Sequence, residues 1–296
     1  MRGASLIEDA AVTRTGSSLR FANGCRRSSK RQEVPTVVTL SNDALAVAVE
    51  VATLHGLRVG SPHVLAKGAA LVVALEPARV VVKVARSGLA RELAVVRWLA
   101  ARQLPVVAPA AGMPPIVHRR GGWELTFWQR LAGGPGDPGV AGAALRAIDE
   151  ALAAYDGDVK RGWSKAPPGL PAVVGETIAA AERAFAGAPL RPQHGDPHDG
   201  NWLGGRWLDF EDVRMAPPEW DRACLLFCSE ADGDAWAARV AAELPAGDRA
   251  RTEAAIRLRA ASSAIWGASR GDHAHVERRV AWLTARRAAT PASCPP

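Results

Sequence analysis

The residues best suited to chemistry lie together in a short polar segment, HGDPHDGN, in the second half of the chain. There His194, Asp196 and Asn201 fit the pattern H-x-D-x-x-x-x-N, in which the asparagine follows the aspartate by five residues. In phosphoryl transfer, a carboxylate orients the accepting hydroxyl group, and a nearby amide oxygen holds a metal ion on the phosphates. One short loop can supply both groups. Alone, the pattern also fits a loop with capping carboxylates, so other residues must support it.

A second carboxylate follows at a suitable distance along the chain. Asp209 stands eight residues after Asn201, in WLDFED, and Gly204-Gly205 between them predicts a tight two-residue hairpin that brings the chain back. Hard cations such as Mg²⁺ prefer carboxylate oxygen, so Asp209 is a candidate metal ligand. Asp212, three residues later, is expected to cap the next segment instead.

Lys83 stands out because lysine is scarce in this chain. It lies within the β-branched run VVVKVAR, which predicts a strand, and Glu92 follows early in a helical segment. Taken singly, Lys83 could be a lysine on an edge strand, and Glu92 an ordinary first-turn acid that the helix dipole stabilises. Together they favour a phosphate-binding ammonium group that a carboxylate orients. The lysines are Lys30, Lys67, Lys83, Lys160 and Lys165.

These residues need a scaffold, and the first half of the chain predicts one built around a sheet. A helix is expected from Ser41 to Gly56, and a hairpin with its turn at Glu76-Pro77-Ala78 is expected from Val64 to Arg86. A helix over LARELAVVRWLAARQL and two strands over PPIVHRR and GGWELTFWQRL follow. The turn-rich AGGPGDPG then indicates a boundary.

The second half is predicted to be mainly helical, with the polar segment set between helices. Helices are expected over residues 144–154 and 177–186 and in three stretches beyond residue 232. The expected organisation is a tail without chemistry over residues 1–35, an N-terminal lobe over residues 36–131 and a helical lobe over residues 132–290.

The motifs, in this order, resemble the aminoglycoside phosphotransferase family, the small-molecule branch of the protein-kinase-like fold. The resemblance runs from about Val64 to Leu226 and rests on VVVKVAR, ARELAVVRWLA, HGDPHDGNWL, WLDFED and APPEWDRA. It implies an α+β, two-lobed fold with a small N-terminal β-rich lobe and a larger helical C-terminal lobe. It also implies an enzyme that moves the γ-phosphoryl group of ATP or GTP, with Mg²⁺, to a hydroxyl of a small molecule such as an aminoglycoside or other antibiotic, a sugar or an amino alcohol.

The resemblance assigns roles by position. It implies a catalytic Asp196, Mg²⁺ ligands Asn201 and Asp209, and phosphate binding by Lys83 with Glu92. The family's glycine-rich nucleotide loop is reduced here to Lys67-Gly68. The resemblance also implies a hinge from Phe127 to Leu131, including Trp128, Gln129 and Arg130, whose backbone would hydrogen-bond the base. It implies that His194 and Asp221 support the catalytic loop.

Composition narrows the partners. The net charge of +7 comes from arginines scattered through Ala-rich stretches, without a basic stripe interleaved with aromatics, so nucleic acid is not an expected partner. No apolar run approaches the ~20 residues that span a membrane, and no secretory h-region is present, so we expect a cytoplasmic protein that binds a nucleotide and a small hydroxylated substrate. The sequence leaves the oligomeric state open. The four cysteines have no zinc spacing and are expected to be free thiols.

Two other functions stay open at this stage. A nucleotide-binding pseudokinase acting as a regulatory partner usually lacks the strand lysine or one of the two aspartates, all of which are present here. A metal-dependent phosphoesterase would need further His and Asp ligands for a two-metal site. The acceptor is also open, because aminoglycosides are polycations whereas this chain is basic; Asp232 and Asp234 could meet a cation but stand where helices commonly begin.

Overall fold

A computed structural model describes residues 37–289, with side chains over residues 42–288. The predicted tail over residues 1–35 lies outside the described residues. The described chain begins with helix α1 (Val37–Leu54), which starts before the expected Ser41, and continues into a five-stranded sheet.

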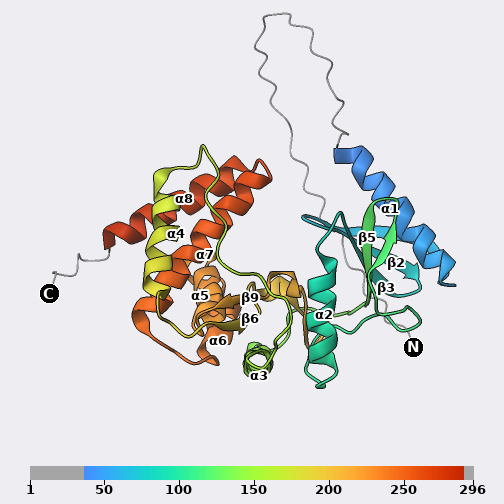
Figure 1. Ribbon diagram of the computed structural model, residues 1–296, viewed down its shortest axis with the longest axis horizontal. Helices are drawn as coiled ribbons and strands as arrows, with labels where there is room; N and C mark the ends of the chain where they lie inside the picture. The colour runs from blue at the N-terminus through green and yellow to red at the C-terminus, as the bar shows by residue number, and fades with distance from the viewer. Residues whose placement is uncertain (1–36, 290–296) are drawn as a thin grey trace, which may run out of the picture. The chain divides into compact units, whose positions relative to one another are not determined.

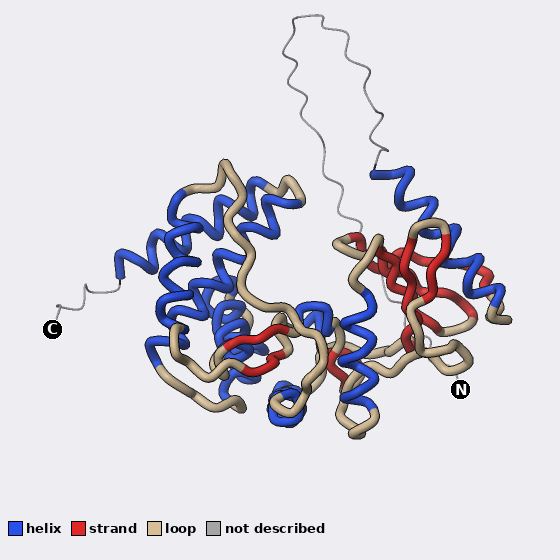
Figure 2. Tube along the Cα trace, viewed as in Figure 1, coloured by secondary structure: helices blue, strands red, loops and turns tan. Residues whose placement is uncertain are grey.

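The sheet is antiparallel throughout, with the strand order β1-β2-β3-β5-β4. Figures 1 and 2 show its strands beside α1. The predicted hairpin over Val64–Arg86 was wrong in its first part, because the chain turns once more at Gly68, where Gly68 N donates to Ala70 O over 3.0 Å. The apolar residues around this turn hid it from the pattern. The strands are β1 (Val59–Lys67), β2 (Leu71–Pro77), β3 (Val80–Ala85), β4 (His118–Arg120) and β5 (Trp123–Gln129).

One face of the sheet is covered by α1, which contacts all five strands (Figure 1). Val73, Val82 and Leu125 are fully buried there, because β-branched and aliphatic residues pack well on a pleated surface. Helix α2 (Leu89–Ala100) follows β3 and contacts β5. Gly88 precedes it with φ +97°, a left-handed conformation that glycine adopts without steric cost.

The C-terminal part is helical. Helix α3 starts six residues earlier than the expected Ala144, because Asp137 caps it through Gly139 N (2.6 Å) and Pro138 occupies its first position. The helices are α3 (Pro138–Leu152), α4 (Ala172–Phe185), α5 (Trp220–Asp232), α6 (Ala235–Ala242), α7 (Arg249–Ser269) and α8 (His273–Ala289).

The polar segment lies between α4 and α5 and forms short strands and 3₁₀ turns. Strands β7 (Trp202–Leu203) and β8 (Arg206–Trp207) pair across Gly204 and Gly205, whose φ angles of +55° and +75° fit a type I′ turn. The predicted two-residue hairpin is therefore confirmed. Two 3₁₀ turns, Asp199–Asn201 and Phe210–Asp212, flank it, and β6 (Arg191–Gln193) pairs with β9 (Arg214–Ala216) at its outer ends.

Two of the four cysteines lie within the described residues. Cys224 and Cys228 are free thiols on α5, and Cys25 and Cys294 lie outside the described residues. No helix within residues 37–289 combines the length and the apolar character that crossing a bilayer requires.

Candidate active site

The loop between β6 and β7 carries Asp196, and the first turn of α5 fixes its backbone. The buried carboxylate of Asp221 accepts hydrogen bonds from His194 N (2.7 Å) and Gly195 N (2.8 Å). The Trp220 indole donates to Gly195 O over 2.9 Å. Charge-assisted hydrogen bonds of this kind are short and strong, so α5 sets the position of Asp196.

His194 is a buried structural member of this loop. Its Nε2 lies 3.0 Å from Leu208 O, which can only accept, so Nε2 carries the proton. Its Nδ1 then accepts from Asp196 N over 3.4 Å. Burial lowers the pKa of His194, which favours this neutral form. The ring therefore links the Asp196 loop to the segment before Asp209.

Asn201 closes the loop. Its amide nitrogen donates to the backbone oxygen of Asp196 over 2.9 Å, so the amide oxygen is the end left to accept a hydrogen bond or hold a cation. Asn201 O also accepts from Leu208 N over 2.8 Å, which ties it to the residue before Asp209.

Lys83 joins the sheet to this segment. Its ammonium nitrogen lies 2.9 Å from Glu92, 2.7 Å from Asp209 and 3.1 Å from Glu211. Lys83 is 8% exposed and Glu92 2%. The predicted lysine and its three carboxylate partners thus come from β3, from α2 and from the start of the second 3₁₀ turn. Asp209 has φ +61°, which is uncommon for a residue with a side chain.

The charges of this cluster do not balance. Burial acts to lower the pKa of Lys83, but its three carboxylate partners outweigh burial and raise the pKa above the usual range. Burial raises the pKa of Glu92, and Lys83 only partly opposes it. The two directions agree on one physical fact: three carboxylates share a single ammonium group, so negative charge is in excess.

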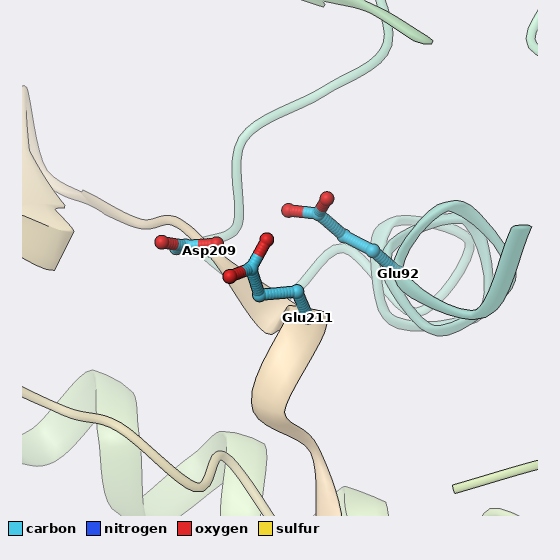
Figure 3. Close-up of side chains that lie close together, drawn as sticks. All are labelled: Glu92, Asp209 and Glu211. Atoms are coloured by element: carbon cyan, nitrogen blue, oxygen red, sulfur yellow. The ribbon is translucent and has the colours of Figure 1, made fainter. Parts of the chain in front are cut away.

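This excess fits a divalent cation. Glu92, Asp209 and Glu211 each offer a carboxylate oxygen, and these three oxygens lie within 4.8 Å of one another (Figure 3). Carboxylate oxygens are the ligands that Mg²⁺ prefers, and a divalent ion would cancel the net charge of three acids and one lysine. Glu211 was not predicted; its signal was a second acid two residues after Asp209 in WLDFED.

Histidine takes no part in this cluster. The cluster of Glu92, Asp209 and Glu211 is the one group of three or more His, Cys, Asp or Glu side chains within residues 42–288 that could hold a metal. A phosphoesterase with a two-metal centre would need a larger donor set with histidine or further aspartate. The described residues do not bring such a set together.

The two aromatic side chains of the predicted hinge face the protein interior, whereas Gln129 is exposed. Phe127 and Trp128 are buried in separate cores, and the Trp128 indole donates to Thr126 Oγ1 over 3.0 Å. Arg130 forms an ion pair with Glu76. Trp128 therefore presents no exposed ring face on which a base could stack.

The hinge backbone is also largely engaged. Gln129 N donates to Ala108 O (2.9 Å), and Arg130 N donates to Arg79 O (3.2 Å). Leu131 N–H, the next donor along the chain, has no hydrogen-bond partner among residues 42–288. Of the predicted hinge segment, Leu131 is thus the position with a backbone donor to offer.

Three cationic side chains form ion pairs with Asp196 and Asp212, which the sequence did not reveal. Arg259, from α7, forms an ion pair with Asp196. Lys160 and Arg214 both bind the carboxylate of Asp212. The predicted capping role of Asp212 was wrong, because its carboxylate forms ion pairs with Lys160 and Arg214 and accepts no hydrogen bond from a backbone amide of the following segment.

Other candidate groups lie elsewhere. Asp234 caps α6 through Ala237 N (3.0 Å), and Asp232 pairs with Arg279 (2.8 Å). A separate hollow of about 1420 Å³ between α4, α7 and α8 contains none of the predicted site residues.

A model of the APH phosphotransferase enzyme family matches residues 66–255, more than half of the chain. No curated protein matches. Among solved structures, a thermostable mutant of aminoglycoside phosphotransferase APH(4)-Ia in a ternary complex with ADP and hygromycin B has a TM-score of 0.61 at 13% identity, covering 84% of this chain and 100% of that one.

Two further solved structures are similar to this chain. The GDP and kanamycin complex of APH(2")-IIia has a TM-score of 0.57 at 13% identity and covers 82% of this chain and 99% of that one. A choline/ethanolamine kinase family protein from Mesorhizobium loti has a TM-score of 0.59 at 19% identity, with coverages of 85% and 96%. These likenesses confirm the predicted fold, an antiparallel sheet followed by a helical part as in kinase-like phosphotransferases. Because the family match spans most of the motifs and both parts of the fold, the chain belongs to the phosphotransferase enzyme family.

Proposed function

We propose that this protein transfers the γ-phosphoryl group of ATP or GTP, bound with Mg²⁺, to a hydroxyl group of a small molecule. The observation that carries the proposal is the contact of Lys83 with both Glu92 and Asp209. This contact joins the sheet, α2 and the segment tied to the Asp196 loop in a single cluster of charge.

The nucleotide would bind against this cluster. Lys83 would bind its phosphates, and Glu92 would keep the ammonium group oriented, as the 2.9 Å contact between them suggests. Asp209, with Glu211 and the amide oxygen of Asn201, would hold Mg²⁺, which would neutralise charge on the phosphates. The Leu131 N–H is the proposed backbone donor to the base.

Asp196 would receive the acceptor. Its carboxylate would bind the acceptor hydroxyl and orient the oxygen toward the γ-phosphorus. A bond forms between this oxygen and phosphorus, and the bond from phosphorus to the β–γ bridging oxygen breaks. The electron pair leaves with the nucleoside diphosphate, and the hydroxyl proton passes to Asp196 and then to water. Orientation and charge neutralisation supply most of the rate enhancement in such a reaction.

Purified protein would be incubated with MgATP or MgGTP and a panel of hydroxylated antibiotics, sugars and amino alcohols. Mass spectrometry should find a product heavier by one phosphoryl group. Asp196→Asn should reduce transfer by at least about 10³-fold, because the amide cannot accept the proton. Asp199→Asn is the matched control, since Asp199 lies in the same loop but is exposed and contacts only its neighbours, Gly200 N and the His198 ring.

Nucleotide binding separates the outcomes. Asp196→Asn should bind MgATP like the wild type, whereas Asp209→Ala should bind it more weakly and with less dependence on Mg²⁺. Full turnover in Asp196→Asn contradicts the assignment of Asp196. Binding of MgATP without any product across a broad panel would instead favour a pseudokinase, and a failure to bind MgATP contradicts the whole proposal.

A further inference from the structure

Arg259 is the feature of the site that the motifs do not account for. It projects from α7, and its Nη2 donates to Asp196 Oδ1. The side chains of Arg259 and Asp196 are 21% and 23% exposed, so the pair is only partly shielded from solvent. The family match ends at residue 255, so Arg259 lies beyond the segment that the family pattern describes.

The ion pair leaves donors and an acceptor available. A guanidinium group has five N–H donors in a planar fork, and the bond to Asp196 uses one of them. The Arg259 Nε–H is buried without a hydrogen-bond partner. Arg259 is also the one side-chain donor to the Asp196 carboxylate among residues 42–288, which leaves Oδ2 able to accept a hydroxyl proton.

More positive charge lies close to this pair. The backbone of Asp212 packs against Gly195, the residue before Asp196, so closely that a Cβ on Gly195 would lie 2.0 Å from Asp212 O. The Asp212 carboxylate holds Lys160 (2.5 Å) and Arg214 (3.3 Å). Two backbone hydrogen bonds fix Lys160 beside Arg214. Lys160 N donates to Val213 O, and Met215 N donates to Lys160 O.

Arg259, Lys160 and Arg214 are thus paired with only two carboxylates, Asp196 and Asp212, so this group of five side chains has a net positive charge. A polycationic acceptor needs the reverse, because a like charge a few ångströms from a guanidinium group is repelled. The two acids that could have met a cation, Asp232 and Asp234, are engaged with Arg279 and with the α6 N-terminus.

We propose that the acceptor is a hydroxylated compound with an anionic group, a carboxylate or a phosphate, within a few atoms of the hydroxyl that receives the phosphoryl group. This inference rests on the proposed function and names the substrate class of the same site. Arg259 binds the anionic group with its remaining donors, while the hydroxyl group lies on Asp196 Oδ2. A carboxylate or phosphate suits this residue because both accept two parallel hydrogen bonds from a guanidinium fork.

The test uses matched compounds that differ only in charge. The three-carbon set is glycerate, glycerol 3-phosphate, glycerol and 3-amino-1,2-propanediol; the six-carbon set is glucuronate, glucose 6-phosphate, glucose and glucosamine. Kanamycin and hygromycin B extend the cationic arm. Transfer is measured as formation of ADP and of phosphorylated product, and binding is measured by calorimetry on the protein loaded with Mg²⁺ and a non-hydrolysable ATP analogue.

Anionic members should be phosphorylated or bound at least about 10-fold better than their neutral and cationic counterparts, and the carboxylate and phosphate arms show which anion is preferred. Arg259→Gln should lower kcat/KM for the preferred anion about 10- to 100-fold, the range expected when hydrogen bonds to a charged group are lost. Arg259→Lys keeps the positive charge but not the planar guanidinium group. Its kcat/KM for the preferred anion should lie between those of the wild type and Arg259→Gln. Arg257→Gln is the matched control, because Arg257 stands on the same helix and binds Glu253 instead.

Three results would contradict the inference that the acceptor carries an anionic group. A preference for amines or neutral compounds, an unchanged preference in Arg259→Gln, or no transfer to and no binding of any anionic compound overturns the inference. If MgATP binding persists in those cases, the phosphotransferase proposal stands and only the acceptor class is wrong. If the wild type does not bind MgATP, the proposed function itself fails.

Discussion

The variant Glu211→Gln removes one of the three carboxylates around Lys83 with almost no change in side-chain shape. Glu211 lies 3.1 Å from Lys83 Nζ and within 4.8 Å of carboxylate oxygens of Glu92 and Asp209. Glutamine keeps the length and one oxygen but carries no charge. The variant therefore separates the attraction of Glu211 to Lys83 from its repulsion by the other two acids.

The two effects can be compared directly. With an effective dielectric constant of about 20, the attraction at 3.1 Å is about 5 kcal/mol. At about pH 8.5, above the pKa of about 7 to which burial raises Glu92, each repulsion at 4.8 Å or less is at least about 3.5 kcal/mol, and two of them act on Glu211. Repulsion thus exceeds attraction by about 2 kcal/mol, which solvent screening of a side chain that is 32% exposed reduces to about 1 kcal/mol.

Without metal, Glu211→Gln should therefore raise the free energy of unfolding by about 1 kcal/mol, an increase in Tm of roughly 2–4 °C. With Mg²⁺ and nucleotide the sign reverses, because a ligand of the cation is lost and Mg²⁺ affinity falls about 10-fold. Thermal unfolding by circular dichroism, in EDTA and then across a Mg²⁺ titration with a non-hydrolysable nucleotide, measures both effects.

The control is Glu50→Gln, which removes the exposed partner of Arg120 far from this cluster and should change Tm little under either condition. A loss of stability above about 2 kcal/mol for Glu211→Gln in EDTA would mean that Glu211 serves as a partner of Lys83 rather than as a metal ligand. An unchanged Mg²⁺ dependence would refute the role of Glu211 in binding the cation.

Two other predictions concern the frame of the Asp196 loop. Gly195→Ala should reduce transfer more than 100-fold, because the new Cβ would lie 2.0 Å from Asp212 O. Gly205 is the control, because it also has a positive φ but a Cβ there would meet nothing within 4 Å. Gly205→Ala should cost only about 1 kcal/mol of stability and leave kcat/KM near that of the wild type. Equal effects of the two variants on kcat/KM would contradict this. Burial, with the Asp221 charge and hydrogen bond, raises the pKa of Asp149 well above its usual range, so the wild type loses stability as pH rises above about 4, where Asp149 ionises only in the unfolded chain. Asp149→Asn removes that loss and should gain stability over the wild type from pH 5 to pH 8 in thermal unfolding; a difference that does not change with pH would refute a protonated Asp149.

The parts of the site that the sequence predicted are those that local spacing determines. Asp196 and Asn201 share one loop, and their separation of five residues is enough for the Asn201 amide to reach the Asp196 backbone. Gly204-Gly205 fixes the hairpin that returns the chain to Asp209. Lys83 and Glu92 are nine residues apart, across one turn from a strand into a helix, so their contact also follows from local geometry.

What the sequence did not predict depends on packing between distant segments. Arg259 stands 63 residues after Asp196, and only the packing of α7 against α5 brings it to the loop. One of many arginines in Ala-rich helices carries no local sign of this contact. Asp212 is a different case, because its cations come from Lys160 on a connecting segment and from Arg214 two residues on, and neither has a spacing that marks an ion pair.

Helix α5 holds both functions of the loop in one packing arrangement. Its first turn supplies Asp221, which binds the loop backbone, and its buried face packs against α7, which supplies Arg259. A change in the packing of α5 against α7, for example at Cys224 or Leu258, would thus move the brace of Asp196 and the cation beside it relative to each other. The nucleotide cluster depends in part on β3 and α2, through Lys83 and Glu92, and in part on Asp209, whose segment is tied to the Asp196 loop. Substitutions in the α5–α7 core should therefore alter kcat and acceptor preference together and lower the affinity for MgATP to a smaller extent, because Lys83 and Glu92 stand on β3 and α2.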